Sequence, residues 1–305
     1  MTAPQRESSH DSRPTAHDAT KLHSEAERRW KRVEQDHPEL METITFGRGL
    51  VALYIDEIPQ TAVAMLTSEQ ARLKLAAGIP LLDDEDLDLD LPRLQHLFLK
   101  ICALVSRQPE MASAERLSAA VADGSCEVEA LLTFALAEDT EALDEIAAKL
   151  EIEAAQLQTL TGFLVSAALI GVARAYEPLL REAQTPWEEA GCPICGGPPL
   201  IAELQGSSGE RQLRCAACGT GWRTLVNRCA HCGTTEGKAL HYLAVEGREE
   251  KYRVDLCDRC HGYLKSATSF APTPAELLTI EDAATLYLDA AARERGYTST
   301  PELDG

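Results

Sequence analysis

The chain has 305 residues, a formal net charge of −20 and an isoelectric point near 4.8. This length is sufficient for about two domains that each bury a core. The acidic charge argues against general binding to nucleic acid or to anionic lipid. Eight of the ten cysteines lie between residues 192 and 260. Their concentration indicates a local site and not a disulfide-rich composition.

The N-terminal segment is polar and resembles neither a secretion signal nor a lipidation site. We therefore expect a cytoplasmic protein, and in that compartment paired cysteines more often bind metal or carry out redox chemistry than form disulfides. The longest apolar stretch, residues 163–173, is far shorter than the ~18 residues that a membrane span requires. It predicts a buried helix, and no membrane insertion is expected.

Helical periodicity dominates the first part of the chain. Residues 1–20 are polar and aperiodic, which predicts a mobile tail. The clearest helix starts near Pro92, where apolar residues recur at intervals of three and four. Other amphipathic segments are expected at residues 43–58, 61–77, 113–121, 127–137, 140–150 and 153–182. Residues 21–185 are thus predicted to form an all-helical domain.

Within this domain, the acidic run DDEDLDLDL occupies residues 83–91. It lacks the glycine turn and the glutamate spacing of a calcium loop, so we favour a solvated acidic loop over a docking patch. Cys102 falls on an apolar helix face and is expected in the core. Cys126 follows a Gly-Ser turn and is expected to be an inert or occasionally reactive thiol, not a ligand.

The pattern changes at residue 186. Residues 186–268 contain short alternating segments, turn residues and four Cys-x-x-Cys pairs. Residues 269–305 return to helix, because Thr273, Pro274 and Glu276 fit an N-cap, a first-turn proline and a capping-box partner, and Gly296 can end the helix. We expect this last helix to pack back on the helical domain.

The four cysteine pairs can be matched into two four-ligand sites in three ways, and loop-closure entropy varies too slowly with length to decide between them. The sequences between the pairs are more informative. A strand, a glycine turn and a second strand separate the first two pairs, and the same order separates the last two. Site one is therefore predicted to contain Cys192, Cys195, Cys215 and Cys218, and site two Cys229, Cys232, Cys257 and Cys260.

The spacing has a chemical reason. In a Cys-x-x-Cys turn both sulfurs can face one ion, and backbone N–H groups point at the thiolates. Gly196, Gly219 and Gly233 follow the second cysteine, where the tight turn favours a small residue, whereas His261 takes this place in the fourth turn. Because each site already has four sulfurs, His231 and His261 are not expected to be ligands.

Two further side chains near the sites are interpreted as structural. His241 lies on a predicted strand, where packing is favoured over function, and Trp222 is expected to cover a metal site as an apolar lid. Tetrahedral sites made only of thiolates suit zinc or iron, and the spacing does not separate the two metals. Zinc would make the sites structural, whereas iron would also allow one-electron chemistry.

Five segments carry a family resemblance. They resemble the formate dehydrogenase accessory protein family, FdhE, most closely over residues 187–266, and they read CPICGGPP, LRCAACGTGWR, RCAHCGTTEG, HYLAVEG and DLCDRCHGYLK. One departure is His261, where the family motif often has a second glycine. With the helical pattern, the resemblance implies an α+β multidomain fold. An all-α N-terminal domain would precede a duplicated rubredoxin-like or zinc-ribbon β module and a short C-terminal helix.

The resemblance also implies a function. Members of the family are cytoplasmic factors, not enzymes, that contact the catalytic subunit of respiratory formate dehydrogenase before its export and are needed for its activity. Iron has been associated with their metal modules. Carried over to this chain, the ligand role falls on the eight cysteines of sites one and two, which would hold two metal ions, iron or zinc. A homodimer is left open.

Two alternative functions were weighed. A zinc-ribbon nucleic-acid-binding factor is disfavoured, because residues 187–266 contain ten Lys or Arg and ten Asp or Glu even before thiolates are counted. A rubredoxin-like electron-transfer protein stays open, since a tetrathiolate iron site can change oxidation state. A thioredoxin-like exchanger is disfavoured, because its single pair opens a helix. The sequence contains no phosphate loop, His-Glu-x-x-His helix or nucleophile elbow.

Overall fold

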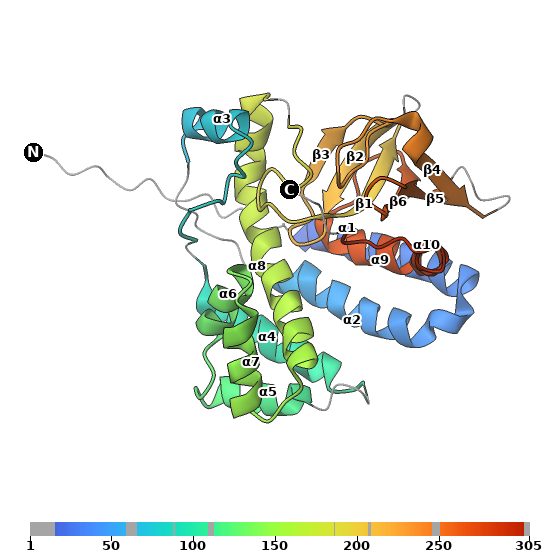
Figure 1. Ribbon diagram of the computed structural model, residues 1–305. Coiled ribbons are helices and arrows are strands. Elements are labelled where there is room, and N and C mark those ends of the chain that lie inside the picture. The colour runs from blue at the N-terminus through green and yellow to red at the C-terminus, as the bar shows by residue number, and fades with distance from the viewer. Residues whose placement is uncertain are drawn as a thin grey trace, which may run out of the picture.

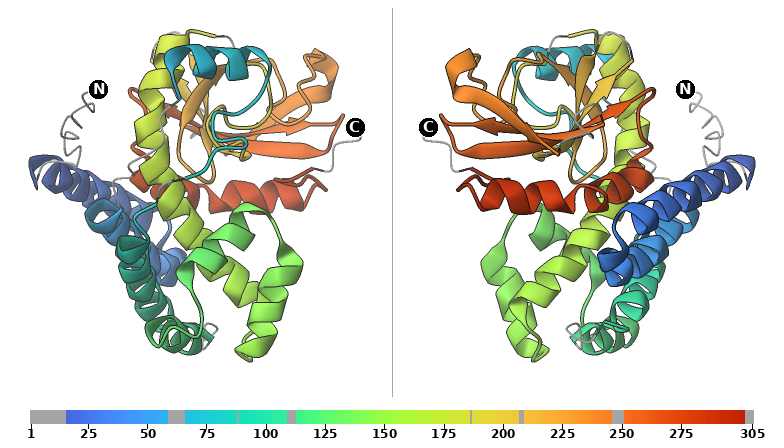
Figure 2. Two further views of the ribbon diagram at one scale, coloured as in Figure 1. Left: turned by 90° about the vertical axis from the view of Figure 1, so that its left-hand side faces the viewer. Right: turned by 90° about the vertical axis from the view of Figure 1, so that its right-hand side faces the viewer.

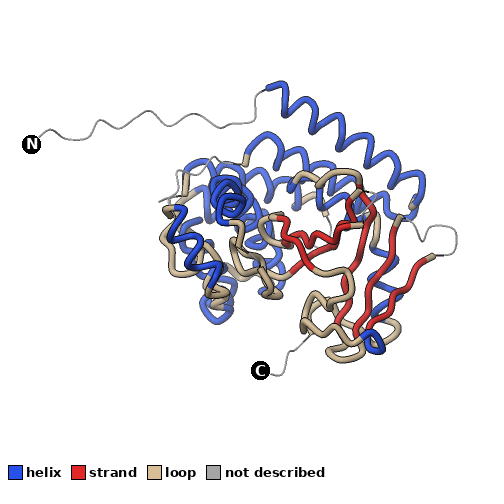
Figure 3. The backbone as a smooth tube through the Cα atoms, turned by 90° about the horizontal axis from the view of Figure 1, so that it is seen from above, coloured by secondary structure: helices blue, strands red, loops and turns tan. Residues whose placement is uncertain are grey.

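The computed structural model describes residues 16–58, 66–87, 89–108, 113–185, 187–206, 209–245 and 251–301. Helices surround one long central helix, α8, and a six-stranded sheet lies beside it (Figure 1). Seen from above, the strands gather on one side of the molecule and most of the helices on the other (Figure 3). The α+β fold class predicted from the sequence is confirmed.

The helices that precede the sheet agree with the predicted segments. Their bounds are α1 (Ala16–Asp36), α2 (Met41–Glu57), α3 (Ser68–Ala76), α4 (Leu91–Val105), α5 (Ser113–Ala122), α6 (Val128–Leu136), α7 (Thr140–Lys149) and α8 (Ala154–Ala183). Residues 16–20, assigned to the tail, are helical, and residues 1–15 lie outside the described residues. The helix expected at 61–77 begins only at Ser68, because Thr67 and Gln70 form a capping box there, while residues 61–65 are not described.

The helix α8 organises the molecule. By length and composition α8 could cross a membrane, but long core helices have the same length and composition. Within the protein, 56% of the most apolar 18-residue stretch of α8 is buried. Around its N-terminal half, α4 to α7 form a continuous core that includes Leu97, Phe98 and Ile101. Cys102 is only 1% exposed in this core, as predicted, and burial raises its pKa to about 12. Cys126 is buried in the same core, and burial raises its pKa as well.

The sheet combines the two cysteine-bearing halves. Its strands are β1 (Pro199–Gln205), β2 (Glu210–Cys215), β3 (Gly221–Thr224), β4 (Leu240–Ala244), β5 (Tyr252–Cys257) and β6 (Gly262–Ser269), in the spatial order β3-β2-β1-β6-β5-β4. The two predicted hairpins are β1–β2 and β4–β5. A third strand was not predicted in either half. Parallel pairing of β1 with β6 joins the halves into one sheet.

The C-terminal segment packs beneath the sheet, beside α1 and α2 (Figure 2). It contains the short helices α9 (Leu278–Ala283) and α10 (Leu286–Arg293). Trp30 of α1, Val254 of β5 and Leu288 of α10 belong to one buried core, so the expected return of this segment to the helical domain is confirmed. On the same face of the sheet, buried Lys265 pairs with Asp289 at 2.7 Å.

The expected capping box at the start of this segment does not form. Pro274 takes the N-cap position of a 3₁₀ turn, Ala275–Leu277, that precedes α9. The Thr273 N–H donates to Glu203 Oε1 at 3.0 Å, and the carboxylate of Glu276 pairs with Arg174 of α8. One long-range hydrogen bond and one long-range ion pair therefore replace the local cap. Gly296, in contrast, adopts a left-handed φ of 85° just after α10, as expected for a helix-ending glycine.

Candidate metal centres

The chain has four Cys-x-x-Cys turns, which we call knuckles. Three of them contain the same hydrogen bond from a backbone N–H group to a cysteine sulfur. In each of these three, the residue two places after the first cysteine donates its N–H to that cysteine's Sγ at 3.4 Å. The pairs are Ile194 to Cys192, Ala217 to Cys215 and His231 to Cys229. An N–H group aimed at sulfur favours the thiolate over the thiol. The knuckles are thus arranged to present thiolates.

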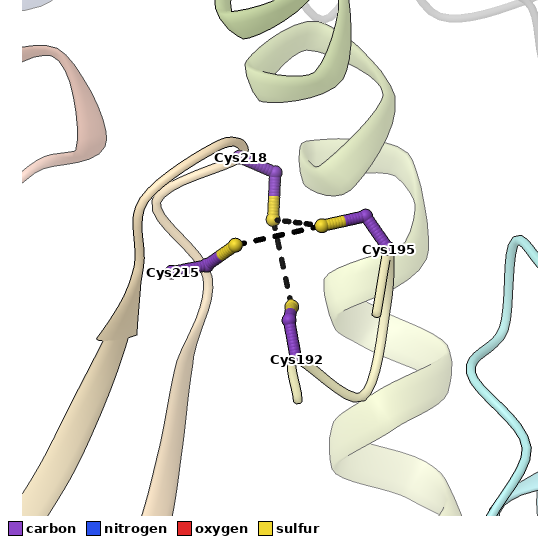
Figure 4. A group of neighbouring side chains, drawn as sticks. All are labelled: Cys192, Cys195, Cys215 and Cys218. Carbon is purple, nitrogen blue, oxygen red and sulfur yellow. Dashed lines mark hydrogen bonds between the residues drawn. The ribbon is translucent and has the colours of Figure 1, made fainter. Parts of the chain in front are cut away.

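Site one brings together the two knuckles of the first half. The Sγ atom of Cys195 lies 3.4 Å from that of Cys215 and 3.5 Å from that of Cys218, and Cys192 Sγ lies 3.6 Å from Cys218 Sγ. Figure 4 shows the four sulfurs pointing toward one another from the two facing knuckles. All four lie within 4.8 Å of one another, so they could hold a metal ion.

Site two brings together the two knuckles of the second half. Its Sγ atoms lie 3.8 Å apart in the pairs Cys229–Cys260 and Cys232–Cys257, and all four are within 4.8 Å of one another. Four sulfurs placed about 2.3 Å from one ion in a tetrahedron are separated by about 3.8 Å. Both sites fit such an ion, and site one is slightly more compact.

The electrostatics of the sulfur groups also fit a cation. Burial raises the pKa of the Cys192 thiol, and its hydrogen bond with Cys192 raises the pKa of Cys218. In site two, burial raises the pKa of Cys229 to about 11 and raises that of Cys260 as well. The hydrogen bond with Cys192 lowers the pKa of Cys215, so one thiol of site one ionises more readily while its neighbours resist. Four crowded and mostly buried thiols cannot all ionise unless a cation compensates their charge. A bound metal ion supplies that compensation.

The surroundings of the two sites differ. Three of the four site-one cysteines are buried, and the site lies between the sheet and α8, where Ser166 Oγ donates to Ala217 O at 3.1 Å. Its first knuckle also accepts two backbone bonds from the segment after α3. Leu81 N–H donates to Pro193 O and Leu82 N–H to Ile194 O, both at 2.9 Å. Site one therefore connects the sheet with the helical region.

Site two lies near the edge of the sheet formed by β4 and β5. Its cysteines Cys232 and Cys260 are half-buried, and both line a cavity of about 540 Å³ together with Trp187, Arg228 and Arg259. Solvent or a partner group can thus approach two of the four sulfurs. In site one Cys195 alone is half-buried, and it lines a separate groove of about 640 Å³.

The residue after each knuckle has a left-handed backbone. The φ angles are +77° at Gly196, +71° at Gly219, +68° at Gly233 and +54° at His261. Glycine adopts this conformation readily, whereas a side chain makes it costly. The fourth knuckle therefore keeps the left-handed backbone that follows the others, at the expense of strain at His261, whose ring lies 6.0 Å from that of Tyr297.

The histidines and Trp222 are not part of either sulfur group. His231 is buried, with Nε2 3.0 Å from Tyr263 O, and burial lowers its pKa. His241 lies on the exposed edge strand β4, and its Nε2 atom is 2.7 Å from Asp258 Oδ1. Trp222 is 5% exposed and belongs to the buried cluster that contains Cys215 and Cys218, while its role as a cover of the metal site stays a prediction.

Two buried arginines support the sites and were not found by sequence reasoning. Arg214 pairs with Glu203 at 2.9 Å and donates to Gly219 O at 2.8 Å, so it fixes the second knuckle of site one. Arg211 pairs with Asp255 at 3.1 Å and donates to Arg228 O at 2.7 Å, just before site two. The only sequence signal was a basic residue within a predicted strand beside a knuckle.

This fold, with helices beside a sheet that carries two four-cysteine groups, fits the class of proteins with a duplicated rubredoxin-like or zinc-ribbon module. The model of "FdhE, C-terminal domain" matches residues 227–301. "Protein FdhE homolog" of Stutzerimonas stutzeri is 34% identical over 121 residues, and that of Shewanella oneidensis is 32% identical over 111 residues. These alignments cover 39% and 36% of this chain, and 38% and 36% of the relatives' own length.

A solved structure extends the similarity beyond these segments. The crystal structure of the FdhE protein from Pseudomonas aeruginosa matches with a TM-score of 0.58 and 23% identity, over 91% of this chain and 92% of that chain. At this identity the match concerns the fold. The comparisons therefore agree with the resemblance carried by the four cysteine pairs and their neighbouring segments: residues 227–301 match the FdhE C-terminal domain, more than a third of the chain is similar to FdhE homologs, and the fold is similar to that of an FdhE protein.

Proposed function

We propose that this protein is a cytoplasmic accessory factor that binds the catalytic subunit of formate dehydrogenase and is needed for that enzyme's activity. It would act as a maturation factor and not as an enzyme. The observation that carries the proposal is the pair of four-cysteine groups within an FdhE-like fold. Support for a client-binding role also comes from the net charge of −20, which disfavours nucleic acid as the partner.

Two metal ions, iron or zinc, would be held by the eight cysteines. Their ligands would be Cys192, Cys195, Cys215 and Cys218 in site one, and Cys229, Cys232, Cys257 and Cys260 in site two. Either ion would contribute ligation energy that stabilises the sheet, and iron would add one-electron chemistry. The buried arginines would hold the knuckles that orient the sulfurs. The knuckle N–H groups would donate to the thiolates and partly neutralise their negative charge.

A rubredoxin-like electron-transfer role is a second candidate. It is favoured by the half-buried Cys232 and Cys260, because a partner's redox centre could approach site two through the cavity that they line. Anaerobic absorption spectra test this role. Thiolate-to-iron charge-transfer bands that disappear reversibly on reduction would support it, and a colourless protein loaded with zinc would contradict it.

The main proposal is tested by anaerobic affinity capture of the whole protein with a purified formate dehydrogenase catalytic subunit. We expect a stoichiometric complex. We also expect cells that lack this protein to make the catalytic subunit at normal levels but with little formate dehydrogenase activity. Failure to form a complex, or full activity in those cells, would contradict the proposal.

A further inference from the structure

A groove of about 640 Å³ lies between the acidic loop, helix α6 and helix α8, and we call it the leucine groove. Most of its lining is leucine: Leu82, Leu87, Leu89, Leu91, Leu132, Leu136 and Leu169. The side chain of Leu136 at the end of α6 is 38% exposed. Exposed leucine beside a groove of this size is typical of a surface that receives apolar side chains of a partner.

The charges on the groove all have one sign. Glu85, Asp86 and Glu129 line it, and the lining contains no basic side chain among the described residues. Glu85 is paired with Lys74 at 2.7 Å, whereas no ion pair involves Asp86 or Glu129 in the described part of the chain. Cys195 of site one also lines the groove, and a divalent ion with four thiolates adds a net charge of about −2 nearby. The groove is complementary to a basic partner.

One wall of the groove depends on site one. The segment that leads into the acidic loop is attached to the first knuckle by the backbone bonds from Leu81 and Leu82 to Pro193 and Ile194. The Nζ atom of Lys74 donates to Leu81 O at 3.3 Å and thus supports the same segment. Because an ion in site one would fix the knuckle, it would also fix this wall.

We propose that the leucine groove docks a segment of the client that carries long apolar side chains beside lysine or arginine, and that the ion in site one holds the groove in shape. The inference rests on the proposed function for the identity of the client. The acidic rim repels nucleic acid and anionic lipid, which leaves a basic, apolar protein segment as the occupant. A helix laid into the groove would use both its leucines and its charges.

The groove is tested first with a synthetic amphipathic helix that has leucine on one face and lysine on the other. It is then tested with the purified catalytic subunit. Leu136→Asp should weaken both interactions about tenfold or more, because it places a charge in the apolar contact. The double variant Asp86→Asn and Glu129→Gln should weaken them severalfold and flatten their dependence on salt. A peptide with glutamate in place of lysine should not bind.

Matched controls come from the same helical region. Leu73 on α3 is 55% exposed outside the groove, so Leu73→Asp controls for Leu136→Asp. Glu141 lies in the first turn of α7 as Glu129 does in α6, so Glu141→Gln controls for Glu129→Gln. Both controls should bind like the wild type. Circular dichroism and metal content should be unchanged in all of these variants.

The outcomes separate the groove from the function. If the wild type captures the catalytic subunit and the groove variants capture it equally well, the docking site is wrong and the proposed function stands. If the wild type fails to capture it, the proposed function falls, and absence of peptide binding then overturns the groove too. Self-association that Leu136→Asp abolishes would assign the groove to a second copy of this chain and overturn the proposal.

The link to site one has its own test. Removal of metal with a chelator should speed hydrogen exchange at the Leu81 and Leu82 amides and weaken binding of the leucine-lysine helix. The double variant Cys192→Ser and Cys195→Ser should lose client capture while the helical circular dichroism persists, whereas Cys126→Ser, which lies outside both sites, should keep capture. Unchanged exchange at both amides after removal of both ions would overturn the link.

Discussion

The two cysteine sites have the same type of ligand and the same Cys-x-x-Cys spacing, but they lie in different parts of the fold. Site one lies between the sheet and α8, has three buried cysteines and accepts backbone bonds from the segment that leads into the acidic loop. Site two lies near the β4 edge, where Cys232 and Cys260 border a cavity. The same four-sulfur unit can therefore join distant parts of a chain in one copy and remain accessible in the other. The comparison predicts that site one is the structural member of the pair.

Loss of site one should have the largest effect. We expect Cys192→Ser with Cys218→Ser to unfold the sheet region, because ligation free energies in small zinc modules are on the order of 10 kcal/mol. Cys232→Ser with Cys260→Ser should remove one ion but leave the contact with α8 intact. Thermal unfolding with metal analysis distinguishes the two variants, and equal losses of Tm would break the comparison.

Chelation should release the two ions in sequence. Site two should lose its ion first, since two of its thiolates are accessible, and one equivalent should remain bound in site one. Stopped-flow chelation followed by iodoacetamide labelling measures this order. Label should appear on Cys232 and Cys260 before the cysteines of site one, and earlier labelling of Cys192 or Cys218 would reverse the assignment.

Loss of the buried arginine beside site one should likewise cost more unfolding free energy than loss of the one beside site two. Arg214→Met leaves Glu203, whose side chain is 2% exposed, without its charged partner, and should cost about 3–5 kcal/mol of unfolding free energy. Arg211→Met should cost less, about 1–3 kcal/mol, because Asp255 is 22% exposed and keeps Arg253 at 2.9 Å. Urea unfolding of the metal-loaded protein gives both values. A larger cost for Arg211→Met would contradict this ranking.

Substitutions at the residue that follows a knuckle should range from a cost at Gly219 like that of Arg211→Met to the smallest effect of all, at His261. A Cβ at Gly219 would lie 2.4 Å from Ala275 Cβ, and φ there is +71°, so Gly219→Ala should destabilise by about 2 kcal/mol or more. His261→Gly should change stability by no more than about 1 kcal/mol and in the favourable direction, because it relieves a left-handed side chain. The same urea titration measures both, and destabilisation by His261→Gly would show that its ring contributes more than its backbone costs.

Local patterns predicted most of the fold. The spacing of apolar residues located the helices because each buries one face, as α4 does with Leu94, Leu97 and Ile101. The knuckle and hairpin order predicted which sulfurs lie together, since a hairpin brings its ends into contact. The ligand role and the division of the chain into domains at residues 20, 185 and 268 remain predictions.

The features that were missed depend on distant residues. The strand β3 has four residues, and β6 is buried on both faces over most of its length, so neither shows a regular alternation. Their pairing is long-range, above all that of β1 with β6. Similarly, Thr273 and Glu276 have the local pattern of a capping box, but Glu203 and Arg174 bind them instead. The sequence around a residue does not specify such partners.

The core shared by α1, β5 and α10 has a consequence for biosynthesis. Trp30 is 1% exposed, and its core also contains Val254 and Leu288, which lie more than two hundred residues further along the chain. At translation rates of roughly 5–20 residues per second, the part of the apolar face of α1 that the sheet and the C-terminal helices cover waits about 10–50 s for them. During that interval α2, which packs against α1, covers only part of this face, and the rest stays open to chaperones.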